Sequence, residues 1–318
     1  MTKGQTSLHL DAANCAVSAL SDDAAANGWL LHLRAAGRRG TTERAYRQAL
    51  DYLRRFTQAR GMPPLAALTT EHLREYFLSL YKRGLKPTSV SVWYRAIQQF
   101  YKWLVAEGER PDNPITRIPA PRVADEILPH YSPEEVQRVL DSVGVRNRDW
   151  GALRDRAVIL FLFDTGVRAR ELCDMRMEDL DLHNLSILVH GKAGKQRQVG
   201  IGYASATAIE RYHRRRKVAS RWVFSDQHGG QMTFNGVKMA LGRRFKAAGV
   251  LFRGCHAFRR AFAIAWLDAG GGPEDLARLA GWDSPQMLRR YTRATEGTRA
   301  LAAHRRFSPG DQLQTKRA

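Results

Sequence analysis

The sequence predicts a two-domain protein that is mainly α-helical with one small β-sheet, which is an α+β fold class. The chain has 318 residues, and a domain commonly takes about 100–200 of them. Apolar residues recur at helical spacing through most of the chain. Five prolines between residues 109 and 129 interrupt that pattern and predict a linker between the two domains.

The first domain is predicted to be entirely helical. Residues 1–24 carry no clear period and are expected to form a loose arm, so the domain spans 25–110. A helix is expected near 29–35. Three apolar stripes with helical spacing follow, each bounded by a residue typical of a helix end. They are Tyr46, Ala49, Leu50, Leu53 and Phe56 after Thr41–Thr42; Leu73, Phe77, Leu80 and Tyr81 after Thr69–Thr70; and Trp93, Ile97, Phe100, Tyr101 and Leu104 after Ser89.

The second domain is predicted to be mixed and to cover 130–294, after a linker at 111–129. It opens on Ser132-Pro133-Glu134-Glu135, a capping box with proline at the first helical position. A buried helix is expected over 152–164, which contains the longest apolar run of the chain. The remaining elements are expected as strands at 185–189 and 198–201, helices at 204–217, 233–248 and 256–269, short helices opening at Pro273 and Ser284, and a tail at 295–318.

Charge is the strongest compositional feature. Lysine and arginine number 51 against 31 acidic residues, which gives a net charge of +20 and a pI near 10.5. The excess is spread along the folded region, and a basic globular surface most often binds nucleic acid. The alternative is that a GC-rich genome favours arginine for reasons unrelated to binding.

Composition also excludes several classes of protein. No apolar run approaches the roughly 20 residues of a membrane-spanning helix, and the first thirty residues lack the pattern of a secretory signal. Three widely separated cysteines suit neither a zinc site nor a disulfide framework. We therefore expect a cytoplasmic protein without a membrane partner.

Several polar residues of the second domain can together form a phosphodiester site that needs no metal. Guanidinium groups can hold the non-bridging oxygens, a tyrosine oxygen can attack phosphorus, and a lysine can protonate the leaving oxygen. No acidic cluster indicates two-metal catalysis, and no cofactor motif is present. Each residue alone has an ordinary structural explanation, so the argument depends on their joint order. The set is Arg168, Lys192, His256, Arg259, Trp282 and Tyr291.

The order and spacing of these residues resemble the tyrosine recombinase (phage integrase) family in its two-domain, Xer-like form. Four segments carry the resemblance: Thr165-Gly166-Val167-Arg168-Ala169-Arg170-Glu171-Leu172, the first arginine box; Gly191-Lys192-Ala193-Gly194-Lys195-Gln196-Arg197, the hairpin lysine motif; His256-Ala257-Phe258-Arg259, the HxxR box; and Leu279-Ala280-Gly281-Trp282-Asp283-Ser284 with Tyr291 nine positions after Trp282. The likeness covers about residues 20–300, because the helical first domain resembles the family's SAM-like core-binding domain.

The resemblance implies a role for each residue. Tyr291 would be the nucleophile and Lys192 the general acid, with Lys195 in the same turn as its competitor. Arg168 and Arg259 would hold the scissile phosphate. His256 would assist proton transfer, Trp282 would donate a hydrogen bond where the family usually has a second histidine, and Glu171 would orient one of the arginines. A further departure is Arg260, where the family often has histidine.

The resemblance also implies partners. The two domains would bind double-stranded DNA carrying inverted core recombination sites. Four protomers would assemble on two such sites, while the free chain would be a monomer or a weak oligomer. The direction of recombination would be set by an accessory factor or would need none. The tail would dock on a neighbouring protomer or fold back on its own. Candidate DNA contacts, each equally compatible with a solvated helix face, are Arg44, Arg47, Lys86, Thr88, Tyr94 and Lys195.

Other functions fit parts of this pattern. A type IB topoisomerase uses the same chemistry as a monomer without joining two sites. A DNA-binding regulator on the same scaffold would be expected to lack the tyrosine or an arginine, and all are present. A metal nuclease would need carboxylate clusters. We therefore predict a site-specific recombinase that integrates or excises a mobile element or resolves replicons.

Overall fold

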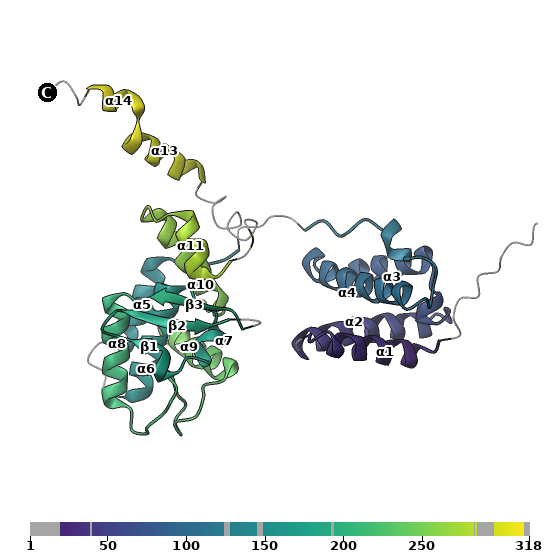
Figure 1. Cartoon of the computed structure of the whole chain (residues 1–318), viewed down its shortest axis with the longest axis horizontal. Coiled ribbons are helices and arrows are strands. Elements are labelled where there is room, and N and C mark those ends of the chain that lie inside the picture. Colours follow the sequence, from purple (N-terminus) through teal and green to yellow (C-terminus); the bar gives the residue numbers. More distant parts are fainter. Residues whose placement is uncertain are drawn as a thin grey trace, which may run out of the picture. The chain divides into compact units, whose positions relative to one another are not determined.

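The computed structural model describes residues 20–38, 40–123, 128–144, 149–191, 194–282, 284 and 296–314. The chain divides into two compact units, Met1–Ala124 and Asp125–Ala318 (Figure 1). Each unit has its own hydrophobic core. The fold is mainly helical with one three-stranded sheet, so the predicted α+β class is confirmed.

The first unit is helical throughout its described residues. Its elements are α1 (Asp22–Ala35), α2 (Gly40–Gln58), η1 (Leu65–Ala67), α3 (Thr70–Lys82), α4 (Pro87–Ala106) and η2 (Pro114–Arg117). The apolar stripes face one shared core, except for Tyr81, which is exposed. In this core Trp29 stacks on Tyr46 with ring centroids 5.1 Å apart and meets Phe100 at 5.4 Å. Helix α4 begins two residues before the Ser89 that we expected to open it. Pro87 accounts for the earlier start, because a proline is favoured in the first helical turn.

The second unit combines helices with the small sheet. Its helices are α5 (Pro133–Val143), α6 (Trp150–Thr165), α7 (Ala169–Cys173), α8 (Tyr203–Arg215), α9 (Phe234–Ala247), α10 (His256–Asp268) and α11 (Pro273–Ala280), with η3 at Met177–Asp179. The antiparallel sheet has the order β1 (Leu180–Asp181), β2 (Ser186–His190) and β3 (Gln196–Gly200), with Ile187 opposite Val199. The tail carries α13 (Glu296–Phe307) and α14 (Pro309–Gln314).

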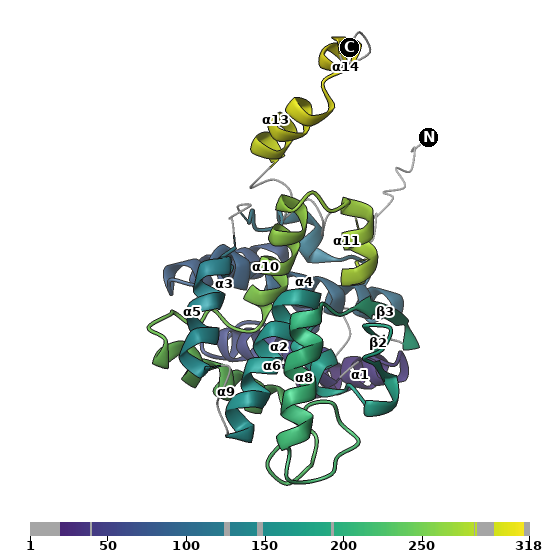
Figure 2. The same ribbon diagram turned by 90° about the vertical axis from the view of Figure 1, so that its left-hand side faces the viewer.

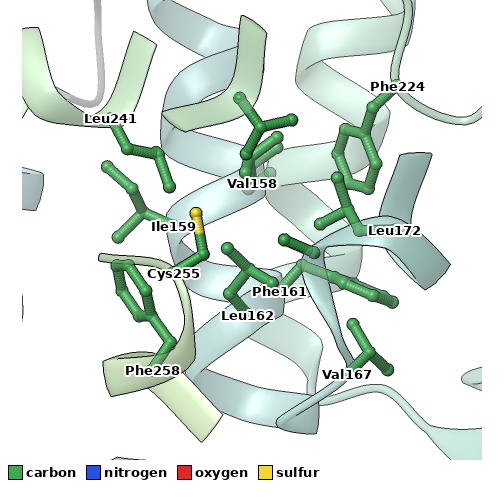
Figure 3. Packing of buried hydrophobic residues seen from close by; sticks show 14 of the residues in the cluster. Val158, Ile159, Phe161, Leu162, Val167, Leu172, Phe224, Leu241, Cys255 and Phe258 are labelled. Carbon is green, nitrogen blue, oxygen red and sulfur yellow. The ribbon is translucent and has the colours of Figure 1, made fainter. Parts of the chain in front are cut away.

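Helix α6 supplies the centre of the second core. Its apolar residues Val158, Ile159, Phe161 and Leu162 are buried among side chains of α7, α9, α10 and the segment after α8 (Figure 3). Helix α8 lies alongside α6, as Figure 2 shows. A smaller apolar cluster joins α10 to α11 and includes Trp282. Because α6 packs against α7, α8, α9 and α10, the segment that follows its last residue, Thr165, is held in a defined place.

Local sequence explains why the second unit begins where it does. The Ser132 hydroxyl accepts a hydrogen bond from the Glu135 N–H at 3.2 Å, and the Glu135 carboxylate accepts one from the Ser132 N–H at 3.0 Å. This reciprocal pair confirms the predicted capping box of α5. The short strand β1 and the helices α13 and α14 were not predicted. The helix expected to open at Ser284 lies outside the described residues apart from Ser284 itself.

Within the described ranges, no helix combines the length and the apolar character needed to span a bilayer.

Candidate active site

A glycine turn at the end of α6 determines where Arg168 lies. Gly166 has a φ of +58°, and a Cβ there would lie 2.2 Å from the Phe262 ring, so only glycine fits without moving that ring. The turn leads directly into α7, where Arg168 is the N-cap residue. The Arg168 side chain is 45% exposed, so its guanidinium group is accessible to a ligand.

Glu171 holds Arg168 in this position. Its carboxylate accepts hydrogen bonds from the Arg168 backbone N–H at 2.9 Å and from the Arg168 Nη1 at 2.7 Å. Burial raises the pKa of Glu171, but hydrogen bonds from Arg197 and Arg168 more than offset that effect, and its pKa lies below the ordinary value. The predicted role of Glu171, orienting an arginine, remains a proposal that this geometry supports.

Arg197 was missed as a site residue. It projects from β3, and its Nη2 and Nη1 donate to the Glu171 carboxylate at 2.7 and 3.2 Å. Its Nε donates to the Leu279 carbonyl at 2.8 Å, so one side chain joins the first arginine box to the end of α11. Arg197 was visible as the last residue of the hairpin motif. The available clue was its place two positions before the buried Val199, on the same face of β3.

Helix α10 brings the HxxR pair to the same place. Arg259 is 1% exposed, and its Nη1 donates to the Gly166 carbonyl at 2.7 Å while its Nη2 donates to the Ala280 carbonyl. Its guanidinium carbon lies 5.2 Å from the centroid of the Trp282 ring. The end of α6, the end of α11 and α10 therefore converge on Arg259, and Trp282 covers it.

His256 is the first residue of α10 and is solvent-exposed on one side. Desolvation by the surrounding protein lowers the pKa of its imidazole, and the positive charges of Arg260, Arg259 and Arg168 lower it further. A histidine with a lowered pKa is neutral at neutral pH and can accept a proton. Among the described residues, no group of three or more His, Cys, Asp or Glu side chains is placed to hold a metal ion.

Two family models match the chain. The model described as "Phage integrase family" matches residues 131–297, which is more than half of the chain, and the one described as "Phage integrase, N-terminal SAM-like domain" matches 26–108. The chain belongs to the phage integrase family. The match over 131–297 spans both arginine boxes and the site described above.

Named relatives within the phage integrase family agree with this assignment. Tyrosine recombinase XerC of Bacillus pumilus is 29% identical over 79% of this chain and 85% of its own length. XerC of Staphylococcus carnosus is 30% identical over 69% of this chain and 75% of its own length.

Solved structures share the fold. XerH recombinase bound to a palindromic difH substrate, described as a post-cleavage complex, matches with a TM-score of 0.69 and 20% identity over 82% of this chain and 79% of that one. A lambda integrase tetramer bound to a Holliday junction matches with a TM-score of 0.67 and 17% identity over 85% of this chain and 76% of that one.

Two residues singled out by the resemblance to phage integrases, Lys192 and Tyr291, lie outside the described residues. Lys195 is described: it is exposed in the turn between β2 and β3, and its carbonyl accepts the Gly191 N–H at 2.7 Å. The structure thus brings together Arg168, Glu171, His256, Arg259 and Trp282 and adds Arg197.

The DNA contacts expected in the SAM-like unit separate into two groups. Arg44, Arg47, Lys86 and Thr88 are exposed, and Arg47 also pairs with Glu43 at 3.4 Å. Tyr94 was wrongly assigned to the surface. Its side chain is 6% exposed and its hydroxyl donates to the Ile118 carbonyl at 2.8 Å, because its position on α4 faces the core. Tyr94 therefore stabilises the unit and is withdrawn as a DNA contact.

Proposed function

We propose that this chain is a site-specific DNA recombinase that cuts and rejoins DNA through a 3′-phosphotyrosyl intermediate. The observation that carries the proposal is the convergence at Gly166: Arg259 binds its carbonyl, and Arg168 follows it by two residues. Two guanidinium groups beside a histidine of lowered pKa form a site suited to a phosphodiester, whose negative charge grows as phosphorus is attacked.

The chemistry exchanges one phosphodiester for another. The Tyr291 oxygen bonds to phosphorus and the bond from phosphorus to the 5′-oxygen breaks. Neutral His256 accepts the tyrosine proton, Lys192 gives a proton to the departing 5′-oxygen, and Arg168 and Arg259 hold the non-bridging oxygens. The 5′-hydroxyl of a partner strand later attacks the phosphotyrosine, so the energy of the broken bond is retained and neither ATP nor a metal ion is consumed.

The partner we propose is duplex DNA with inverted core sites, bound by four protomers on two sites through a Holliday junction. The net charge of +20 favours a polyanion, and binding should weaken steeply with salt. In the tail, Leu301, Phe307 and Leu313 are 67%, 60% and 76% exposed, which suits docking of the tail on a neighbouring protomer. The setting would be the cytoplasm, and the purpose the movement of a mobile element or the resolution of replicons.

The test is covalent trapping on nicked suicide duplexes made from DNA that flanks the coding sequence. In EDTA, the wild-type chain should give a denaturation-resistant adduct, and Tyr291→Phe should give none while binding the same DNA equally well. Tyr203→Phe is the matched control, because Tyr203 is 80% exposed in the same unit and has no assigned role. Salt-sensitive binding without an adduct in the wild-type chain would contradict the proposal and indicate a regulator.

A further inference from the structure

The segment that enters the second unit is bonded to the catalytic helix α10. The Nε of Arg260 donates a hydrogen bond to the Pro129 carbonyl at 2.7 Å. Proline fixes its own backbone φ near −65°, so the chain direction at this carbonyl is already restricted before Arg260 binds it. One bond thus joins the end of the proline-rich linker to the second turn of α10.

Two residues further along, the same segment is held a second time. Tyr131 is 1% exposed, and its ring lies 4.7 Å from the centroids of both Phe245 and Phe258. Its hydroxyl accepts the Arg253 N–H at 2.7 Å and donates to the Gly254 carbonyl at 3.3 Å. Residues 253 and 254 lead directly into His256, so Tyr131 fixes the approach to α10 as Arg260 fixes its second turn.

The Arg253 side chain completes the connection. Its Nη1 and Nη2 donate to the Glu135 carboxylate at 2.9 and 2.8 Å, and Glu135 also caps α5. A bidentate arginine–carboxylate pair fixes orientation as well as distance. This pair therefore joins the first helix of the unit to the turn before His256.

We infer that Arg260 is a positioning residue, which binds the incoming chain at Pro129 and thereby keeps His256 and Arg259 in their reacting orientation. This inference rests on the proposed function. Arg260 occupies the position after the HxxR box where a histidine is common in the family. An arginine reaches a carbonyl on another segment and carries a permanent charge, so it combines a positional and an electrostatic effect in one residue.

The electrostatic effect separates this role from ordinary structural support. Within the described part of the chain, three cations face His256: Arg168 at the start of α7, and Arg259 and Arg260 on α10 itself. Each disfavours the imidazolium form. Removing Arg260 should raise the pKa of His256, so the pH at which cleavage begins should move upward, whereas simple loosening of the fold would lower the rate without such a shift.

The experiment compares full-length variants in single-turnover cleavage of the suicide duplex across pH. Arg260→Ala should cleave on the order of tenfold more slowly, as expected for loss of a charge-assisted hydrogen bond, with the acidic limb of its pH profile moved to higher pH. Arg260→Lys keeps the charge and a donor, so its acidic limb should match the wild type. Lys246→Ala removes one exposed charge from α9 and controls for net charge.

The outcomes are distinct. If the wild type forms the adduct and Arg260→Ala matches it in rate and pH profile, the inference fails while the proposed function stands. A slow Arg260→Ala with an unshifted acidic limb also overturns it, because that result describes loosening alone. A wild-type chain that forms no adduct overturns the proposed function and this inference with it.

Discussion

Replacing Arg197 by alanine is the sharpest test of the site's architecture. Arg197 is the side chain that joins Glu171 to the end of α11, and it is only 13% exposed at the side chain. Its removal deletes two bonds to a carboxylate that is 7% exposed and one bond to the Leu279 carbonyl. Among the described residues, Glu171 then keeps its bonds to Arg168.

The size of the effect follows from that burial. Breaking a buried ion pair by removing one partner costs about 3–5 kcal/mol, because the remaining charge loses much of its compensation; here the bonds of Glu171 to Arg168 remain. For a unit of about 150–250 residues, each kcal/mol shifts Tm by roughly 2–4 °C, so a fall on the order of 10 °C is expected. Scanning calorimetry of the full chain measures it, with Gln198→Ala on the exposed face of the same strand as the control.

Arg197→Ala should also slow cleavage for a reason other than its lower stability. At a temperature where Arg197→Ala is fully folded, Arg168 has lost the network that fixes Glu171, and the segment leading to Trp282 has lost its bond to β3. Single-turnover cleavage should therefore fall by about 10²-fold, as is found when a supporting shell is misplaced by about an ångström. A variant with the wild-type Tm and the wild-type cleavage rate would refute the assignment of Arg197 to the site.

Two further predictions concern the same network. Gly166→Ala should cost about 2–5 kcal/mol, because alanine disfavours positive φ and its Cβ would lie 2.2 Å from Phe262; Gly249→Ala is the control, having a similar φ of +66° but open space around it. Urea unfolding checks this, and equal losses in both variants would contradict the clash. Glu171→Gln should be less stable than the wild type at neutral pH, and the gap should narrow as pH falls below about 4.3, the pKa of an unfolded glutamate. The sign follows because the folded pKa of Glu171 is lowered, so its stabilisation exists above the unfolded pKa and disappears as the folded carboxylate protonates. A gap that stays constant with pH in thermal unfolding would show that the Glu171 charge is not what stabilises the fold.

Sequence patterns predicted those elements whose cause is local. The capping box at Ser132 forms as expected, because all its donors and acceptors lie within four residues. Two strands were expected at 185–189 and 198–201 around the Gly-Lys-Ala-Gly-Lys turn, and β2 and β3 lie at 186–190 and 196–200. The three apolar stripes of the first unit lie on helices. Arg168, His256 and Arg259 were found by their order and spacing. The fold places Arg168 at the start of α7, just after Gly166, and His256 and Arg259 in the first turn of α10.

Local sequence patterns could not predict contacts whose partners lie far away in the sequence. The apolar stripe expected on α4 includes Trp93 and leaves out Tyr94, and only the packing of this helix against η2 shows that the Tyr94 hydroxyl binds a backbone carbonyl. Arg197 is one of 51 basic residues, and its partners are 26 and 82 positions away. Strand β1 has two residues and exists because Leu180 pairs with Ile187.

Backbone carbonyls explain which arginines of this basic chain become part of the site. The last carbonyls of a helix have no partner within it and carry the negative end of its dipole. Gly166 at the end of α6 and Ala280 at the end of α11 both accept from Arg259, and Leu279 accepts from Arg197. These guanidinium groups therefore replace the missing partners of two helix ends while they are buried beside the proposed phosphate site. A lysine could serve one such carbonyl, but its single nitrogen lacks the planar fork that spans two. The same bonds that complete α6 and α11 thus set the distance between the two arginine boxes, and folding and assembly of the site become one process.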